Sequence, residues 1–229
     1  MKKLFLVLVL VLVSKAAFAV SQPLPSFTLQ VNRIEPVLNQ NLSSIQVYNL
    51  ATNAQILNCT QNTCSISVKS GTKVRVVALG QNPVMGFSNW KRSNTGSGGL
   101  CVGSTNTNCD VTITADSIAT ALFKRIKIVR AQLGTGDGVV RVKLNGTVLV
   151  DCANRAPLDC SAGALEGTQV RFEAIAGPGQ QFQKFTGQTG DATVCTGQGA
   201  TFFCVFTLSN NPNTDAHGSG VVGNFIQIP

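Results

Sequence analysis

Histidine is almost absent from this chain of 229 residues: the single one is His217, which lies between Ala216 and Gly218. A hydrolase triad needs a base held between a nucleophile and an orienting acid, and one histidine in a polar loop offers no such arrangement. Carboxylates are also few, ten in total, and none sits in the kind of local pair that suggests a glycosidase. The sequence therefore favours a protein that is not an enzyme, with no catalytic residues.

Metal-ligand patterns are sparse as well. Zinc sites usually combine a tight cysteine pair with a second pair or with histidines, and here only Cys59 and Cys64 come close. Residues 211–215 alternate oxygen-bearing side chains as a calcium loop does, but Ala216 stands where the turn glycine is expected, and a distal glutamate is missing. A polar loop is the better interpretation, so we expect no metal and no cofactor.

Long apolar runs are missing after the first residues of the chain. Lysines at positions 2 and 3 precede an apolar stretch over residues 4–13, and small residues follow at 17–19, which is the order of a secretory signal peptide. We expect residues 1–19 to be removed, with residues 20–26 as a leader. The apolar stretch is shorter than the roughly 20 residues of a membrane-spanning helix. We therefore expect a protein that is secreted, periplasmic or at the cell surface, with no transmembrane segment.

The positive charge of the chain is modest. Removal of Lys2, Lys3 and Lys15 with the signal peptide lowers the net charge from +8 to +5. The excess lies in residues 27–125, which hold eight basic and three acidic side chains, whereas residues 126–225 hold seven of each. We expect no nucleic-acid partner and consider an anionic envelope polymer or a protein instead.

The chain contains an internal repeat. Residues 71–78, Gly-Thr-Lys-Val-Arg-Val-Val-Ala, return at 167–174 as Gly-Thr-Gln-Val-Arg-Phe-Glu-Ala. Each copy lies within its own set of four cysteines, at an offset of 93 to 96 residues. We therefore expect two tandem modules, residues 27–125 and 126–229.

The eight cysteines follow the expected signal peptide and occur four to a module. An even number at repeating spacings in an exported chain predicts disulfides, although three pairings are possible within each module. The local pairing needs only that each pair flank a turn, and such short loops stabilise by roughly 2 to 3 kcal/mol each. It joins Cys59 to Cys64, Cys101 to Cys109, Cys152 to Cys160 and Cys195 to Cys204.

Both modules show the period-two alternation of β-strands, and no window beyond the signal peptide shows a convincing helical period. Strands are expected in the first copy at 27–31, 45–48, 65–68, 73–78, 87–90, 110–113 and 119–123, and in the second at 126–130, 140–144, 147–150, 167–174, 181–185, 203–208 and 221–225. Asn145-Gly146 predicts a tight hairpin turn, since both of its central residues need positive φ. The fold class is thus all-β, with two small antiparallel modules. The orientation of one module relative to the other should be restricted, because residues 123–126 pass directly from the last strand of the first module to the first strand of the second.

These features resemble the bacterial repeat modules related to the divergent B-repeats of internalin-type surface proteins. In the first copy the matching positions are Cys59, Cys64, Gly71, Thr72, Val74, Ala78, Phe87, Trp90, Cys101, Cys109 and residues 118–123. In the second copy they are Cys152, Cys160, Gly167, Thr168, Val170, Ala174, Phe182, Phe185, Gly187, Cys195, Cys204 and Phe225. The sequence departs from the pattern at Lys91-Arg92, where a glycine is expected, and at Phe185, where a tryptophan is. The resemblance implies a secreted or cell-surface module and brings no catalytic residues.

Aromatic residues have two possible roles. Phe87 and Trp90 recur as Phe182 and Phe185, which favours core packing over sugar stacking. Tyr48 has no aromatic counterpart and is the candidate for an exposed ring.

Alternation also predicts which cations face solvent. Val140, Val142 and Leu144 should point inward and leave Arg141 and Lys143 outward, as Val74 and its neighbours leave Lys73 and Arg75 outward in the first copy. Arg125 and Lys127 share one parity on the preceding strand. If those two strands pair, Arg125, Lys127, Arg141 and Lys143 would form one basic face that could bind an anionic polymer; otherwise they only keep the sheet soluble.

The expected function is that of an exported, non-enzymatic structural or adhesion-type protein that binds an envelope polymer or a protein partner. The alternative is a carbohydrate-binding module that uses exposed aromatic residues.

Overall fold

The structure is a computed structural model. It describes residues 23–36, 42–80, 85–92, 99–153, 160–195, 202–209 and 219–228. The expected signal peptide, the first part of the leader and the loop that holds His217 lie outside the described residues.

The described part of the chain is built of strands, with one short 3-10 helix, so the all-β prediction is confirmed. Module 1 contains β1 (Ser26–Ile34), β2 (Ser43–Asn49), β3 (Ala54–Cys59), β4 (Thr63–Lys69), β5 (Lys73–Gly80), β6 (Met85–Lys91), β7 (Asn108–Thr112) and the first half of β8 (Ser117–Leu133). Module 2 contains the second half of β8, then β9 (Gly138–Leu144), β10 (Thr147–Cys152), β11 (Cys160–Leu165), β12 (Gln169–Ala176), β13 (Gln180–Thr189), η1 (Gly190–Cys195), β14 (Phe203–Thr207) and β15 (Ser219–Gln227).

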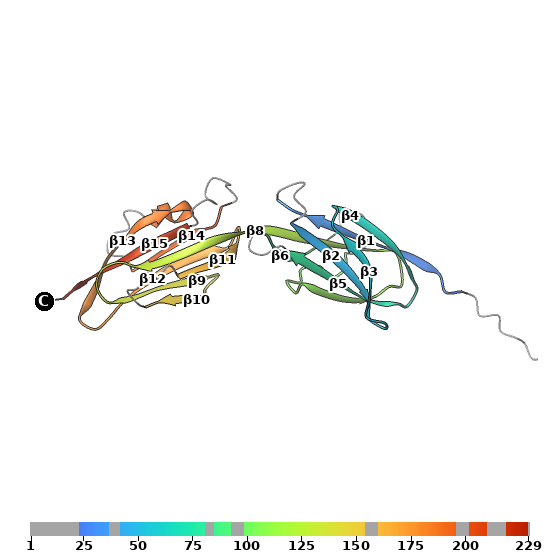
Figure 1. The fold of residues 1–229 in the computed structure, drawn as a ribbon, viewed down its shortest axis with the longest axis horizontal. Helices are drawn as coiled ribbons and strands as arrows, with labels where there is room; N and C mark the ends of the chain where they lie inside the picture. The colour runs from blue at the N-terminus through green and yellow to red at the C-terminus, as the bar shows by residue number, and fades with distance from the viewer. Residues whose placement is uncertain are drawn as a thin grey trace, which may run out of the picture.

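Each module is a sandwich of two sheets, and the two modules have the same strand order. In module 1 the sheets run β4-β1-β8-β6 and β3-β2-β5-β7; in module 2 they run β11-β8-β15-β13 and β10-β9-β12-β14. The two sheets of a module pack face to face over one core, and the modules lie end to end as two lobes (Figure 1). The prediction of two tandem modules is thus confirmed.

One parallel pairing is present in each module alongside the expected antiparallel ones. The first and last strands lie side by side and run in the same direction: β1 with the first half of β8, and the second half of β8 with β15. The chain therefore leaves module 1 pointing away from the point where it entered, which places module 2 in line with module 1.

Strand β8 is the element that the two modules share. Its 17 residues replace the two separate strands expected at 119–123 and 126–130. Residues 117–125 pair with β1 and β6, and residues 126–133 pair with β11 and β15. No turn interrupts the strand between the two halves.

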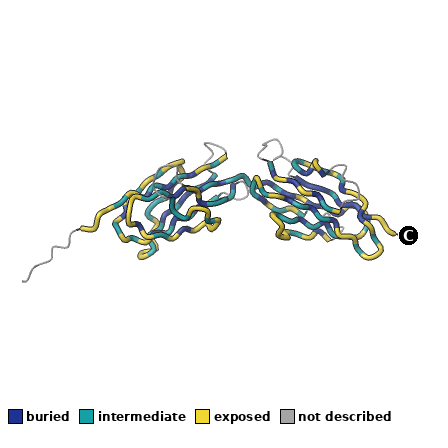
Figure 2. Tube along the Cα trace, turned by 180° about the vertical axis from the view of Figure 1, so that it is seen from behind, coloured by how far each residue is buried: buried dark blue, intermediate teal, exposed yellow. Residues whose placement is uncertain are grey.

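Alternation of buried and exposed side chains places the cores. Along β5, Val74, Val76 and Ala78 are buried, while Lys73 and Arg75 point away from the core. Along β9, Val140 and Val142 are buried in the same way. Figure 2 shows that the buried residues gather inside each lobe.

The aromatic residues form two equivalent clusters. In module 1 the ring of Phe87 lies 5.3 Å from that of Trp90 and 5.9 Å from that of Phe123. In module 2 the rings of Phe182 and Phe185 are 4.8 Å apart, and Phe182 lies 5.6 Å from Phe225. Trp90 is fully buried, Phe182 and Phe185 are buried, and Phe87 packs against the core of module 1. The four rings assigned to the core by sequence therefore lie there.

The disulfides have the local pairing that was predicted. Cys59–Cys64 and Cys152–Cys160 each join the two sheets of a module, from β3 to β4 and from β10 to β11. The other two bonds are Cys101–Cys109 and Cys195–Cys204. In each module one bond thus connects the sheets and another ties a connecting segment to an edge strand.

Candidate binding face

The structure contradicts the basic face expected from sequence. Strands β8 and β9 belong to different sheets and do not pair, so Arg125 and Lys127 do not lie beside Arg141 and Lys143. The error arose at Lys127: the inward parity of Phe123 continues along β8, so Lys127 points to the core side, as Val129 does. Arg125 has the same parity and lies at the boundary between the modules, opposite Met85.

Lys127 is almost fully buried and has a carboxylate nearby. Its side chain is 2% exposed, and its Nζ lies 3.9 Å from Oδ2 of Asp191 at the start of η1. Asp191 also accepts hydrogen bonds from the amide and hydroxyl of Ser209 and from the hydroxyl of Ser219. This group therefore connects β8, η1 and the start of β15, and its role is structural.

Arg141 and Lys143 do point outward, as predicted, but each has an acidic partner. Arg141 forms two hydrogen bonds with Asp151, both 2.8 Å long. Lys143 lies 2.8 Å from Glu173, which also forms an ion pair with Arg171. This face of module 2 is a nearly balanced set of ion pairs rather than a cationic surface.

The outer face of the β3-β2-β5-β7 sheet in module 1 has a different character, and we call it the module 1 face. One row crosses its four strands through Gln55, Tyr48, Arg75 and Asp110, since each of these residues is paired with the next. The Tyr48 ring is half-buried, and its hydroxyl donates to Gln46 at 2.5 Å. The ring is therefore held on the outer side of the sheet among amide and charged groups.

Arg75 and Asp110 form a bidentate ion pair beside Tyr48. The Nε and Nη2 atoms of Arg75 donate to the two carboxylate oxygens of Asp110, both at 2.7 Å. Hydrogen bonding to Arg75 lowers the pKa of Asp110 below its ordinary value and raises that of Arg75. The pair is exposed to solvent and so adds little to stability, but it fixes a planar polar group next to an aromatic ring.

We expect the Asp110 carboxyl to titrate below the ordinary range of an aspartate, and Arg75→Gln to return its pKa to that range. Because the folded-state pKa is lowered, the stabilisation from this pair is present above the unfolded-state pKa and is lost as the pH falls through the folded-state pKa. Carboxyl carbon NMR shifts followed over an acid titration measure this, with Asp151 as an internal comparison because Arg141 lowers its pKa in the same way. An unchanged Asp110 titration in the Arg75 variant would contradict the pairing.

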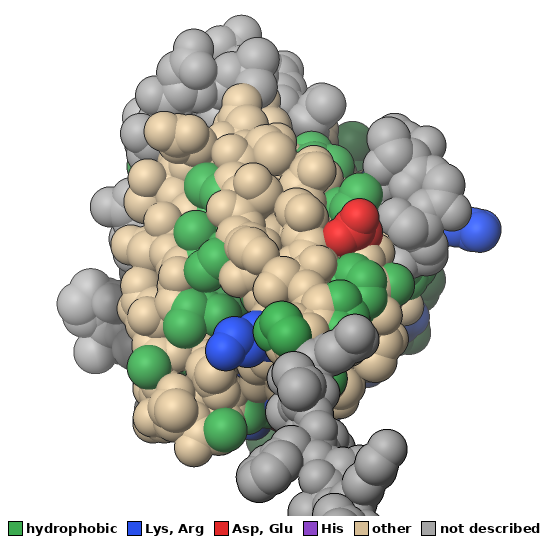
Figure 3. Space-filling view, turned by 90° about the vertical axis from the view of Figure 1, so that its right-hand side faces the viewer, with side chains coloured by type: hydrophobic (Ala, Val, Ile, Leu, Met, Phe, Trp, Pro, Cys, Tyr) green, Lys and Arg blue, Asp and Glu red, His purple; other side chains and the backbone are tan. Residues whose placement is uncertain are grey.

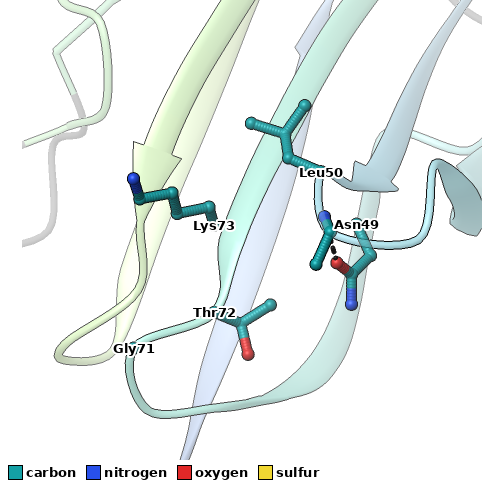
Figure 4. Close-up of a pocket in the computed structure, with 6 residues that line it drawn as sticks. Asn49, Leu50, Gly71, Thr72 and Lys73 are labelled. Carbon is teal, nitrogen blue, oxygen red and sulfur yellow. Dashed lines mark hydrogen bonds between the residues drawn. The ribbon is translucent and has the colours of Figure 1, made fainter.

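A pocket of about 410 Å³ opens at the end of the module 1 face. It lies between the turn that follows β2 and the turn that precedes β5, and its lining residues are Asn49, Leu50, Ala51, Gly71, Thr72 and Lys73. In Figure 4 the side chain of Lys73 extends sideways toward the neighbouring strand, while Leu50 and Thr72 lie at the two turns. Figure 3 looks onto the end of the molecule that is farthest from module 2, where hydrophobic side chains are scattered among polar groups and charged ones are few.

Sequence reasoning identified Tyr48 and placed Lys73 and Arg75 on an outer face, but it missed the pocket and the pairing of Arg75 with Asp110. The loop lengths contained a usable signal. Four residues, 50–53, connect β2 to β3, whereas the two residues Asn145-Gly146 connect β9 to β10. The longer loop is what builds a wall beside Thr72.

The part of the chain that the structure describes contains no group of three or more histidine, cysteine or acidic side chains that could hold a metal ion. Within the same residues, no helix is both long enough and apolar enough to cross a membrane.

The fold defines a class: tandem, disulfide-bonded β-sandwich modules. The model of the divergent InlB B-repeat domain family matches residues 48–127 and again residues 145–216. These two regions cover more than half of the chain, and the chain belongs to this family. Among curated proteins, none matches the sequence.

Several solved structures show remote similarity. The Bacillus anthracis TIE protein is 8% identical, with a TM-score of 0.28 over 87% of this chain and 33% of that one. A streptococcal ancillary pilin is 11% identical, with a TM-score of 0.30 over 89% and 63%. The pilus adhesin SpaC from Lactobacillus rhamnosus GG is 10% identical, with a TM-score of 0.30 over 89% and 31%. This chain spans less than two thirds of each of these proteins, and similarities of this size carry no conclusion about its function.

Proposed function

We propose that this protein is an exported, non-enzymatic, adhesion-type protein of the cell surface, in which a stiff two-module body presents the module 1 face to an envelope polymer or a protein partner. The observation that carries the proposal is β8, a single strand that belongs to both modules. A body of this kind holds a binding face at a fixed distance and angle, which is the mechanical requirement of an adhesive or structural surface protein.

The junction between the modules has specific contacts besides β8 itself. Strands β6 and β11 pair with successive residues of β8, with Met85 opposite Arg125 and Leu165 opposite Ile126. The amide of Glu166 donates to the carbonyl of Arg125 at 3.0 Å, and Nζ of Lys124 donates to the carbonyl of Glu166 at 3.1 Å. These bonds tie the end of module 1 to the turn after β11.

Close packing at Gly86 tightens the same junction. A Cβ atom at this position would lie 2.7 Å from Cδ2 of Leu165 and 3.3 Å from Cγ1 of Ile126. The backbone of β6 therefore rests directly on side chains of module 2. Bending at the junction would have to break this packing as well as the hydrogen bonds, which supports a restricted orientation.

The module 1 face is the surface that we assign to binding. The excess of basic over acidic side chains lies in this half of the chain. The face itself combines Tyr48, the Arg75–Asp110 pair and an open pocket. The equivalent position to Tyr48 in module 2 is Lys143, which is already paired with Glu173. Aromatic side chains on such faces contribute much of the binding energy of interfaces.

Carbohydrate binding is the second candidate function, and it is favoured by the outward position of Tyr48 beside planar polar groups. An aromatic ring can pack against the apolar side of a sugar, while amide, guanidinium and carboxylate groups can bond to its hydroxyls. This candidate differs from the first in the nature of the partner and not in the location of the surface.

Binding of the exported chain to isolated envelope fractions tests the proposal. The double variant Tyr48→Ala/Arg75→Gln should bind at least tenfold more weakly, because it removes a ring and a cation from the module 1 face. The matched control is Lys143→Ala/Arg171→Gln, which changes the equivalent positions of module 2 and should bind as the wild type does. If the two double variants bind equally, the module 1 face is not the binding surface.

A further inference from the structure

The pocket at the tip of module 1 has an equivalent place in module 2 that is already covered. Gly71-Thr72-Lys73 corresponds to Gly167-Thr168-Gln169. In module 2 this turn faces the junction: a Cβ atom at Gly167 would lie 3.1 Å from Nζ of Lys124, and the amide of Glu166 donates to the carbonyl of Arg125. In module 1 the same turn is at the free end, and a Cβ at Gly71 would meet no atom within 4 Å.

The free turn is not built to receive another copy of the chain in the way that module 2 receives module 1. Leu165 makes the apolar contact with Gly86 at the junction, and Lys69 stands at the equivalent position in module 1. An exposed lysine in place of the contacting leucine removes the apolar part of such an interface. The tip is therefore a surface for a different occupant.

Hydrogen bonds fix the backbone of the pocket, and three of its lining residues have polar side chains. The amides of Leu50 and Thr72 donate to the carbonyls of Lys73 and Lys69, at 2.9 and 3.2 Å, and the amide of Ala51 donates to Oδ1 of Asn49 at 2.9 Å (Figure 4). Pockets of this size bind ligands through an apolar surface with a few placed polar groups. A ligand would thus meet a wall that is already ordered, which lowers the entropic cost of binding.

The side chains of the pocket select for an anionic ligand that is rich in oxygen. Lys73 offers an ammonium, Asn49 an amide NH₂ and Thr72 a hydroxyl, so the site mainly donates hydrogen bonds. Leu50 and Ala51 supply an apolar surface of the kind that packs against the C–H side of a sugar ring. A carboxylate on that sugar would pair with Lys73 at the rim.

The position of Tyr48 extends the site beyond one sugar. Lys73 lies two residues before Arg75 on β5 and so points to the same face, and Tyr48 is the cross-strand partner of Arg75. A chain that leaves the pocket along this face would pass Tyr48 and the Arg75–Asp110 pair. This continuity favours a polysaccharide over a peptide. The Tyr48 ring and the planar Arg75–Asp110 pair lie where successive sugars of such a chain would pass.

We infer that the tip pocket is a subsite for an acidic sugar unit, such as a uronic acid, within a surface polysaccharide. The inference rests on the proposed function and names the partner class of the same surface. It adds Asn49, Thr72 and Lys73 to the binding residues.

Titration calorimetry of the exported chain with tri-galacturonic acid, and with its fully methyl-esterified form, tests the inference. We expect the acid to bind and the neutral ester to bind about tenfold more weakly, since the ester loses the charge-assisted bond to Lys73.

Lys73→Gln should weaken binding of the acid by about tenfold, and this variant should no longer prefer the acid over the ester. Thr72→Val should weaken both probes by a similar, smaller factor. The charge-matched control Lys91→Gln changes an exposed lysine of the same module and should bind as the wild type does.

The outcomes separate the inference from the proposed function. If the chain binds neither probe, or if Lys73→Gln and Lys91→Gln bind the acid equally well, the tip is not an acidic-sugar subsite. Loss of envelope binding in Tyr48→Ala/Arg75→Gln would still uphold the proposed function in that case. If envelope binding is destroyed by prior protease treatment of the fraction and no saccharide binds, the partner is a protein and the inference is wrong.

Discussion

Replacing Trp90 with alanine is expected to lower the free energy of unfolding of module 1 by about 3 to 5 kcal/mol. Trp90 is the largest fully buried side chain of the described residues, and it packs against Phe87 in the cluster that also holds Phe123. Its indole nitrogen also donates to the carbonyl of Asn106 at 2.8 Å. The substitution would leave a cavity and a carbonyl without its donor, in a module whose whole stability is of the order of 5 to 15 kcal/mol.

Trp90→Phe is the matched control, because Phe185 holds the equivalent position in module 2. It keeps an aromatic ring but loses the hydrogen bond to Asn106, so we expect a smaller loss, about 1 to 3 kcal/mol. Hydrogen exchange of the β6 and β8 amides measures both variants. Since Trp90 is the single tryptophan of the chain, native fluorescence at short wavelength checks its burial. Long-wavelength emission with a nearly unchanged exchange rate in Trp90→Ala would contradict a core role.

Asp191→Ala is expected to destabilise module 2 by about 3 to 5 kcal/mol, because it takes the carboxylate away from the buried ammonium of Lys127. The variant also removes the acceptor for Ser209 and Ser219. Denaturant unfolding followed by amide NMR signals of β13 and β15 separates module 2 from module 1. A loss below about 1 kcal/mol would show that Lys127 does not depend on this partner.

The double variant Lys127→Met/Asp191→Ala distinguishes the charge from the hydrogen bonds. Methionine keeps much of the volume of the lysine stem without its charge, so the double variant should be more stable than Asp191→Ala alone. Lys127→Met by itself leaves the serine hydrogen bonds of Asp191 intact and should cost less. If the double variant is as unstable as Asp191→Ala, the serine bonds rather than the buried charge account for the loss.

Much of the fold could be predicted from sequence because its signals are local. The alternation around Val74 and Val140 defined strands and their inward sides, the repeat at Gly71 and Gly167 defined two modules, and cysteine spacing favoured the local disulfides. Strands β3 and β11 were missed. The exposed edge residues of β3 and the small residues of β11 give little alternation, so pairing with a neighbour decides their conformation.

The features that sequence could not supply depend on distant parts of the chain. Nothing local shows that β8 and β9 belong to different sheets, and this, together with the inward parity of Lys127, made the basic face wrong. Lys127 occupies the place that Phe27 has in module 1, and a carboxylate that accompanies it there, that of Asp191, lies 64 residues later in the chain. The Arg75–Asp110 pair likewise joins residues 35 positions apart.

Residual dipolar couplings of the backbone amides test the central claim, that β8 and its junction make the two modules one stiff body. The couplings of the module 1 strands and the module 2 strands, fitted separately, should give alignment tensors of equal magnitude and common orientation. Insertion of a Gly-Ser pair between Lys124 and Arg125 should make the two tensors differ, because it interrupts β8 at the junction. Unequal tensors in the unmodified protein would contradict a shared rigid strand and, with it, a fixed presentation of the module 1 face.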